Sequence, residues 1–323
     1  MKQGSKGRSN VVFILSAVIS LAIALWGIVG SSSFSQVSSN LVTKLETNFE
    51  GFYLYGMTFF ILFAVVLALS PYGNTKLGGD EEKPEYSRVS WFAMLFAAGM
   101  GVGLVFWGVA EPLSHYVAPI AGIEPLSTES AQFSLRSCFM HWGLHPWACY
   151  AIVGLSLAFF QFRRKKPALT STTIEPIIGR QTRGVAGKAV DVYTTVLTVI
   201  GVATSFGMGA LQLSGGLGYL FDIPNGAMTW AVLIIVVTCI FLWSSISGVD
   251  KGIKILSNTN LVLFFGMMIL AFCVGSQSDI LSGMFIGIRD YIVDFFPDSF
   301  RMNANGDASW ILSWRVFYWA WWL

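Results

Sequence analysis

Charged side chains are scarce in this sequence. Asp, Glu, Lys and Arg together account for 12% of its 323 residues, about half the share that is usual in soluble domains. Hydrophobic residues account for 54%, and the mean hydropathy is +0.63. This composition excludes a soluble globular protein. The net charge of +2 indicates no nucleic-acid partner, because the basic residues collect in short loops between apolar runs.

Cysteine and histidine are also rare, with four and three residues. The cysteines are scattered and show no disulfide or metal spacing. His141 and His145 lie one helical turn apart, but no Glu stands between them as in H-E-x-x-H, so we expect no metal site. No Ser/His/Asp or Cys/His signature is present, and we expect neither an enzyme nor a bound cofactor. Only Glu111 and Asp191 approach the ends of apolar runs, which argues against an internal proton relay.

Long apolar runs are what the sequence has instead. A membrane span needs about 20 predominantly apolar residues. Seven such runs lie near residues 11–31, 51–70, 91–111, 142–162, 190–220, 228–247 and 256–275, and an eighth opens around Trp310 and stops at Leu323. The first run lacks an A-x-A cleavage site, so we expect a retained helix. We also expect the chain to be a fragment of a longer protein, because it stops inside an apolar run.

Basic residues are distributed unevenly between the loops. Fifteen of the 20 Lys and Arg residues fall on the side of the N-terminus, so the positive-inside rule places that terminus in the cytoplasm. The most basic inner segment, 162–188, is expected to anchor the topology and to contact anionic lipid; a regulatory role is the alternative. Segment 282–300 has apolar side chains at helical i, i+3/i+4 spacing, which predicts an amphipathic helix in the outer interface or against another subunit.

Three glycines alternate in the third apolar run, at Gly99, Gly101 and Gly103. Gly99 and Gly103 form a G-x-x-x-G pair, which is typical of close helix packing. Three glycines in five residues also weaken a helix by roughly 1 kcal/mol each. An unwound stretch would be tolerated where it lines a cavity, and its free N–H and carbonyl groups could hold a carboxylate or a cation.

Aromatic residues gather in two places. Trp142, Trp147 and Tyr150 fall on one side of a helix at about 100° per residue, with Pro146 expected to bend it. The terminal run adds Trp319, Trp321 and Trp322. Such residues form interfacial belts in membrane proteins. The alternative is a cage, because aromatic faces attract a quaternary ammonium group.

Hydroxyl groups line the fifth apolar run, at Thr194, Thr195, Thr198, Thr204 and Ser205. Hydroxyl and carbonyl oxygens suit sodium. Threonine in a membrane helix is more often hydrogen-bonded to its own backbone, so both interpretations stay open.

Four stretches, taken in order, resemble the betaine/carnitine/choline transporter family: GMGVGLVFWGVAEPLSHY (99–116), HWGLHPWACYAIVGL (141–155), GVATSFGMGALQL (201–213) and WRVFYWAWW (314–322). The resemblance implies an all-α integral membrane protein with the leucine-transporter-type inverted-repeat fold of twelve spans, of which seven and the start of an eighth are present. It assigns spans one and two to residues 1–90, the first repeat to 91–281, the interfacial helix to 282–300 and the start of the second repeat to 301–323.

The resemblance also implies roles for individual residues. The ammonium cage would consist of Trp142, Trp147, Tyr150 and Trp322, with Trp321 beside it. The glycine segment Gly99, Met100, Gly101 and Gly103 would face the substrate. Ala97 and Met100 would supply backbone to one sodium site, and Thr198 would supply a hydroxyl to a second site.

Coupling to an ion is implied by two positions. Proton-coupled choline members of the family carry Asp where this chain has Gly103, whereas sodium-coupled betaine members carry Gly. The chain therefore resembles a sodium symporter. Val202 occupies the place of the hydroxyl partner of Thr198, so one sodium site is expected to be absent or built differently.

The sequence and the resemblance together predict a multi-pass protein of the bacterial inner or plasma membrane that imports glycine betaine with sodium. The resemblance implies a role in osmoprotection, and homotrimers are expected to form through the 282–300 helix. Sodium, lipid and a quaternary ammonium substrate are its expected partners, without nucleic acid. The alternatives are a choline or carnitine transporter that works by proton coupling, uniport or precursor exchange, and a membrane sensor or binding protein that does not transport.

Overall fold

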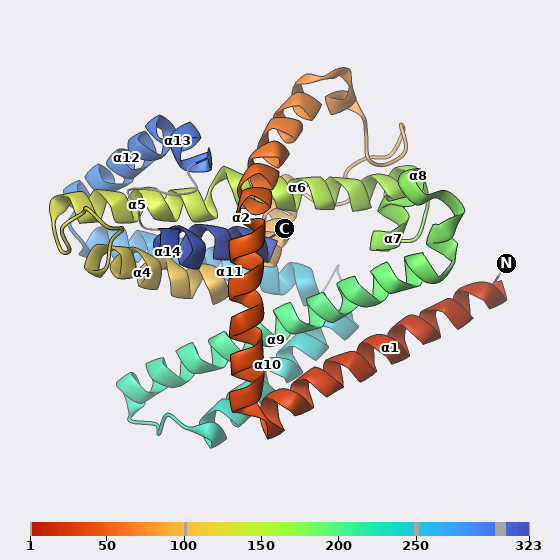
Figure 1. Cartoon of the computed structure of the whole chain (residues 1–323), viewed down its shortest axis with the longest axis horizontal. Helices are drawn as coiled ribbons and strands as arrows, with labels where there is room; N and C mark the ends of the chain where they lie inside the picture. Colours follow the sequence, from red (N-terminus) through yellow and green to blue (C-terminus); the bar gives the residue numbers. More distant parts are fainter. Residues whose placement is uncertain (1, 100–101, 249–251, 301–307, 323) are drawn as a thin grey trace. The chain divides into compact units, whose positions relative to one another are not determined.

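The computed structural model describes residues 2–99, 102–248, 252–300 and 308–322 (Figure 1). Every regular element in these ranges is a helix, which confirms the all-α membrane class. The chain divides into two compact units. The first unit comprises residues 1–82, 115–200 and 288–323, and the second comprises 83–114 and 201–287.

Six helical segments of the described residues are long and apolar enough to cross a membrane. They are Asn10–Val29, Ser31–Leu69, Thr128–Arg163, Val185–Phe221, Ala227–Ser247 and Lys254–Val274. The predicted run 91–111 is described in two parts, α3 (Arg88–Gly99) and α4 (Val102–Val117). Residues 100 and 101 lie outside the described residues, so the predicted unwinding at the alternating glycines stays a prediction.

The first unit is organised around α2 (Ser31–Leu69), which follows α1 (Lys2–Val29) and bends at Phe49. Its buried residues Leu54, Met57, Thr58 and Ile61 have the i, i+3, i+4, i+7 spacing of one helix face. This face packs on α6 (Leu144–Ala158), α13 (Phe295–Phe300) and α15 (Phe317–Trp322). Helix α2 therefore forms the core of the unit that holds the predicted aromatic residues.

Other elements complete the first unit. They are the 3₁₀ helix η1 (Pro71–Asn74), α5 (Thr128–Trp142), the π-helix η2 (Phe159–Arg163), α7 (Thr170–Thr173), α8 (Glu175–Ile178), the 3₁₀ helix η3 (Gly179–Arg183), α14 (Ala308–Trp310) and the π-helix η5 (Ile311–Val316). Ser127 caps α5 by accepting a hydrogen bond from the Ser130 N–H, which satisfies one of the free donors at the helix start. Helix α9 (Val185–Phe221) contributes its first part to this unit.

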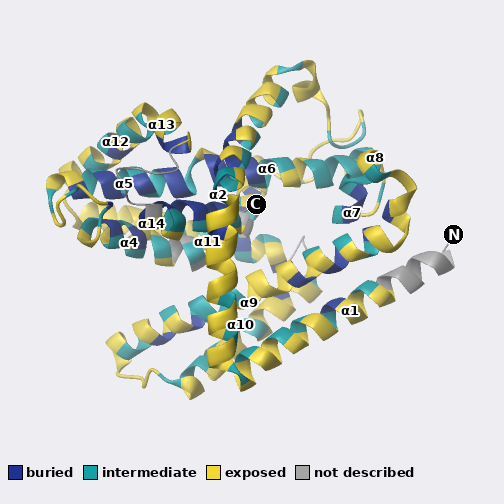
Figure 2. Cartoon of the chain, in the orientation of Figure 1, coloured by how far each residue is buried: buried dark blue, intermediate teal, exposed yellow. Residues whose placement is uncertain are grey.

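The second unit contains the remainder of α9 together with α10 (Ala227–Ser247) and α11 (Lys254–Val274). Helix α3 packs along α11, where the rings of Phe96 and Phe264 lie 5.1 Å apart. Only 6% of the most apolar window of α10, and the same share of α11, is buried. In the first unit, Figure 2 shows similar exposure along α1. Apolar surface of this extent fits contact with lipid.

The predicted span 142–162 is interrupted at Gly143. Helix α5 ends at Trp142 and α6 starts at Leu144, so Pro146 lies in the first turn of a new helix, where its missing N–H is not needed. A Cβ at Gly143 would lie 2.3 Å from the Phe139 carbonyl oxygen and 2.8 Å from the Tyr291 hydroxyl. The break therefore lies at the glycine, three residues before the proline that was expected to bend the helix.

Helix α12 (Gln277–Val293) begins five residues before the predicted interfacial segment 282–300 and ends one residue before Asp294. Helix α13 follows at Phe295. The Tyr291 hydroxyl of α12 accepts a hydrogen bond from the Leu144 N–H at 3.0 Å. Burial raises the pKa of Tyr291, so its hydroxyl stays protonated at neutral pH. This hydrogen bond joins α12 to the start of α6.

Candidate functional site

The predicted aromatic residues of the fourth span lie on two consecutive helices. Trp142 is the last residue of α5, whereas Trp147 and Tyr150 lie on α6 with their ring centroids 5.7 Å apart. Because Gly143 separates Trp142 from the other two, the three do not share one continuous helical face. Trp142 packs instead against Tyr318 of α15, at a centroid distance of 5.4 Å. Aromatic side chains of α5 and α15 thus meet through a pair that the sequence did not predict.

Three histidines are fully buried among the aromatic rings of the first unit. The ring of His115 lies 4.4 Å from that of Trp314, and His141 stacks on Tyr318 at 5.3 Å. His115 and His141 are 5.8 Å apart. We call His115, His141, Trp314 and Tyr318 the histidine–aromatic cluster. Its side chains come from the end of α4, from α5 and from the η5–α15 segment.

The third histidine, His145, contacts two further rings. It stacks on Trp319, with centroids 4.3 Å apart and planes 19° from parallel. The Phe295 ring lies 5.1 Å away. The His145 Nε2 atom is 3.0 Å from the Ser299 hydroxyl. We call Phe295, His145 and Trp319 the His145 stack; it connects α13, α6 and α15.

Two arginines and two aspartates form a charged network beside these rings. Arg136 pairs with Asp294, and its Nε lies 3.4 Å from the Asp298 carboxylate. Arg315 donates to the Asp298 carbonyl at 2.7 Å, and its second terminal nitrogen lies 3.7 Å from the Asp298 carboxylate. Two positive and two negative charges balance. Arg315 and Asp298 are both buried, so the opposite charge of each one compensates for the water that the other has lost.

The remaining predicted residues of the first unit are placed as follows. Trp321 has 59% of its surface exposed and packs on Phe317 at 5.7 Å. The side chain of Trp322 lies outside the described residues. Thr198 is exposed on α9, and its hydroxyl donates to the Thr194 carbonyl at 2.8 Å. This is the backbone hydrogen bond that was one of the two interpretations of these threonines.

The glycine segment belongs to the second unit and is described separately from the aromatic residues. Ala97 is half-buried in α3, and Gly103 is half-buried in α4. Met100 and Gly101 lie outside the described residues. Their predicted contacts with substrate and sodium stay predictions.

Sequence reasoning missed the buried histidines and Arg315 as parts of one region. His141 and His145 were considered only as metal ligands, and His115 carried no recognised motif. The available signal was the single cation in an otherwise apolar and aromatic terminal run, because an ionisable residue in such a run usually marks a functional or paired site.

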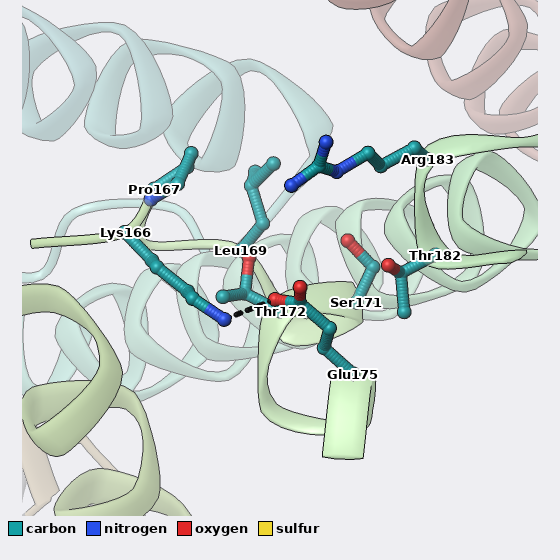
Figure 3. Close-up of a pocket in the computed structure, with 8 residues that line it drawn as sticks. All are labelled: Lys166, Pro167, Leu169, Ser171, Thr172, Glu175, Thr182 and Arg183. Atoms are coloured by element: carbon teal, nitrogen blue, oxygen red, sulfur yellow. Dashed lines mark hydrogen bonds and ion pairs between the residues drawn. The ribbon is translucent and has the colours of Figure 1, made fainter. Parts of the chain in front are cut away.

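A pocket of about 140 Å³ lies in the basic segment between α6 and α9 (Figure 3). Its walls include Lys166, Ser171, Glu175 and Arg183, and Lys166 forms an ion pair with Glu175. A hydrogen bond from Lys166 is the main reason that the pKa of Glu175 is below its usual value. The Ser171 N–H donates to the buried carboxylate of Asp191 on α9 at 3.1 Å. None of the predicted substrate or ion residues lines this pocket.

The long apolar helices, with buried charges that are paired inside the protein, define a multi-pass α-helical membrane protein. Comparison with known proteins makes this class specific. A family model described as betaine/carnitine/choline family transporter matches residues 11–323. The chain belongs to the betaine/carnitine/choline transporter family, which is a family of transporters and not of enzymes.

Three relatives show how far the similarity extends. The glycine betaine transporter OpuD of Bacillus subtilis is 45% identical over 98% of this chain and 62% of the relative. A probable glycine betaine transporter of Desulfitobacterium hafniense is 41% identical over 100% of this chain and 64% of the relative. An ectoine/hydroxyectoine transporter of Virgibacillus pantothenticus is 40% identical over 97% and 62%. The chain thus spans a little under two thirds of the length of these curated relatives.

Proposed function

We propose that the protein is a secondary active transporter that imports glycine betaine by sodium symport, with alternating access. The observation that carries the proposal is the meeting of aromatic side chains from α5 and α15, at Trp142 and Tyr318, in a chain 45% identical to a glycine betaine transporter. A trimethylammonium group has no N–H to donate, so aromatic faces are the neutral groups best suited to hold it. The protein carries such faces on both helices.

In the proposed site, Trp142, Trp147, Tyr150 and Trp322 surround the ammonium group, with Trp321 beside them. Backbone N–H groups of Gly99, Met100, Gly101 and Gly103 hold the carboxylate at the helix interruption that the sequence predicts. Betaine is a zwitterion, and this division gives each of its charged ends a different kind of partner.

Sodium is proposed as the coupling ion, with backbone at Ala97 and Met100 contributing to one site and the hydroxyl of Thr198 contributing to a second site. The Thr198 hydroxyl donates its proton to the Thr194 carbonyl, so its oxygen lone pairs remain able to accept a cation. Val202, four residues further on, offers no second hydroxyl, which favours a second sodium site that differs from the usual pattern.

The wider assignment rests on the family and on the distribution of charge. We propose a homotrimer in the bacterial plasma membrane, with a cytoplasmic N-terminus, lipid contact at 162–188 and a role in osmoprotection. The twelve-span inverted-repeat fold is proposed for the complete protein, with 91–281 as the first repeat, 282–300 as an interfacial segment and 301–323 as the start of the second. No nucleic-acid partner or cofactor is proposed.

Uptake of labelled glycine betaine tests the function. The complete reading frame is expressed in a bacterium that lacks betaine transport, and uptake is measured with sodium and with sodium replaced by potassium. We expect sodium-dependent uptake that excess unlabelled choline does not abolish. A Thr198→Val variant should weaken the dependence on sodium. Uptake that does not depend on sodium would overturn the proposed sodium symport. A lack of betaine uptake would overturn the proposal that glycine betaine is the substrate.

A second candidate function is proton-coupled transport of choline or carnitine, and the structure supplies an observation in its favour. The scarcity of ionisable groups in the apolar runs argued against a proton relay, but His115, His141 and His145 are all buried in one region. The assay above therefore includes choline and carnitine, with a proton uncoupler. Uptake that survives removal of sodium and collapses with the uncoupler would select this alternative.

The same panel also tests the remaining alternatives. Ectoine is included because one relative is named as an ectoine/hydroxyectoine transporter. Exchange and uniport are distinguished by preloading cells with unlabelled substrate. A protein that binds substrate in detergent without moving it in cells would be a sensor or binding protein.

A further inference from the structure

Helix α13 brings two adjacent buried residues against two different parts of the first unit. The carboxylate of Asp298 contacts Arg315 on η5 and Arg136 on α5. The neighbouring Ser299 reaches His145 on α6. Both residues are almost inaccessible to solvent. Since α6 carries Trp147 and Tyr150, and η5 leads directly into α15, α13 joins the two elements that hold the proposed cage.

The hydrogen bonds around Ser299 define the state of His145. The Ser299 hydroxyl donates its only proton to the Phe295 carbonyl at 2.6 Å. It can therefore only accept in its contact with His145. The Nε2 atom of His145 must carry the proton in that contact. The structure thus assigns one orientation to the imidazole ring, held at its edge by α13.

The faces of the same ring fix Trp319. The His145 ring lies 5.1 Å from that of Phe295, and the Trp319 ring is nearly parallel to it at 4.3 Å. Trp319 is completely buried. A buried ring stacked in this way cannot turn without moving its neighbours, because protein interiors are close-packed. The position of His145 therefore limits the rotation of α15 about its own axis.

That rotation determines where positions 321 and 322 fall. Residues three apart on a helix lie on neighbouring parts of its surface, so fixing Trp319 also fixes the direction in which position 322 faces. Resting on the proposed function, we propose that His145 is a positioning residue for substrate. It does not touch the substrate itself; held by Ser299 and stacked on Trp319, it sets the orientation of the tryptophan helix and thereby the affinity and selectivity for the transported zwitterion.

Four variants separate the two parts of this device. His145→Phe keeps a ring for stacking and removes the donor, while His145→Gln keeps a donor and removes the ring. Ser299→Ala removes the acceptor. The double variant His145→Phe/Ser299→Ala removes both partners of this hydrogen bond together, so neither is left buried without the other. Ser244→Ala, a buried serine on α10 in the second unit, is the matched control.

Each variant is made in the complete transporter, its amount in the membrane is determined, and initial uptake rates give KM and the maximal rate for glycine betaine and ectoine. We expect His145→Gln to raise the KM for betaine about tenfold, with a maximal rate per molecule within about twofold of the wild type. The ratio of the two KM values should change as well. His145→Phe and Ser299→Ala should each have a smaller effect, and the double variant no larger an effect than the worse single one.

The proposal would be overturned if His145→Gln left the KM values and their ratio unchanged and lowered only the thermal unfolding temperature. His145 would then stabilise the fold without positioning the substrate site. Strictly multiplicative effects in the double variant would show that His145 and Ser299 do not act as a pair. The proposed function fails separately, if the wild type takes up no zwitterion of the panel. If uptake by the wild type is of choline alone, the same KM comparison is made with choline and carnitine.

Discussion

Helix α10 of the second unit and the α13–α15 region of the first unit are both rich in apolar residues, yet they meet different surroundings. In α10 the most apolar window is only 6% buried. In the α13–α15 region Asp298, Ser299, Arg315 and Trp319 are all buried. The surface of α10 can be covered by lipid and needs no protein partner. The α13–α15 region contains two charged side chains and a polar one that water does not reach.

The comparison shows that hydropathy alone does not separate a lipid-facing helix from one that supports a site. Buried polar groups are stable in a membrane protein only where other protein groups satisfy them. Arg315 has Asp298, and His145 has Ser299. Polar residues with partners on other helices therefore mark the region where α5, α6, α13 and α15 must hold a defined geometry.

The largest effect is expected when the Arg315–Asp298 pair is broken. Arg315→Leu leaves the buried Asp298 with only the partly exposed Arg136, and we expect a loss of roughly 3 kcal/mol in the free energy of unfolding. Arg289→Leu is the control, because Arg289 pairs with Asp290 at an exposed site and such pairs contribute at most about 1 kcal/mol. Unfolding of the purified transporter in detergent with increasing denaturant measures both. Equal losses would mean that burial does not distinguish the two pairs.

A smaller effect is expected from deleting apolar side chains. Ile311→Ala removes a fully buried side chain of η5, and we expect a loss of about 2 kcal/mol because a cavity remains. Ile235→Ala removes an exposed side chain of α10; lipid or detergent fills the space, so we expect a loss below about 0.5 kcal/mol. The same unfolding measurement applies. A larger loss for Ile235→Ala would show that α10 is covered by protein.

Removing aromatic surface at the proposed site should affect transport more than stability. Trp142→Leu should raise the KM for betaine about tenfold, which corresponds to about 1.4 kcal/mol of binding free energy. Trp243→Leu, at an exposed tryptophan of α10, should leave uptake unchanged. Uptake rates over a range of betaine concentrations provide the comparison. A Trp142→Leu transporter with wild-type KM would exclude Trp142 from the ammonium site.

The smallest effect is expected from the exposed ion pairs of the loops. Hydrogen bonds from Arg163 and from the Gly79 N–H are the main reasons that the pKa values of Asp80 and Glu82 are lowered from 3.8 and 4.5. A lowered pKa in the folded state gives stability that is fully present above the unfolded value and is lost as the pH falls through the folded one. We therefore expect the difference in unfolding temperature between the wild type and the Asp80→Asn/Glu82→Gln variant to be constant from pH 7 to about 5 and to shrink as the pH falls below the unfolded values and through the lowered folded values. A difference that stays unchanged throughout the acid range would contradict this assignment.

Several features of the fold were predictable because they depend on local composition. The apolar runs that became α10 and α11 needed only length and hydropathy to be recognised. The predicted bend at Pro146 was displaced to Gly143, because a proline in the first turn of a helix costs little, whereas the close approach of Tyr291 leaves no room for a side chain at position 143.

The candidate site was less accessible to sequence reasoning. Its aromatic residues could be recognised by their chemistry, but the partners of Trp142 and Trp319 depend on contacts between residues more than 170 positions apart. The Ser299–His145 contact joins residues 154 positions apart. No helical period predicts such a contact, because the fold alone decides which helix faces are adjacent. The same reason explains why His145 was considered as a metal ligand and not as a stacking partner.

The order of Asp298 and Arg315 along the chain has a consequence for biosynthesis. Asp298 precedes Arg315 by 17 residues, so the ribosome releases the acidic residue first. An arginine in the centre of a nascent membrane helix costs roughly 3 kcal/mol during insertion. Because Asp298 is synthesised first, the counter-charge of Arg315 is already part of the nascent chain when the arginine appears. The arginine therefore does not depend on a later helix for its charged partner.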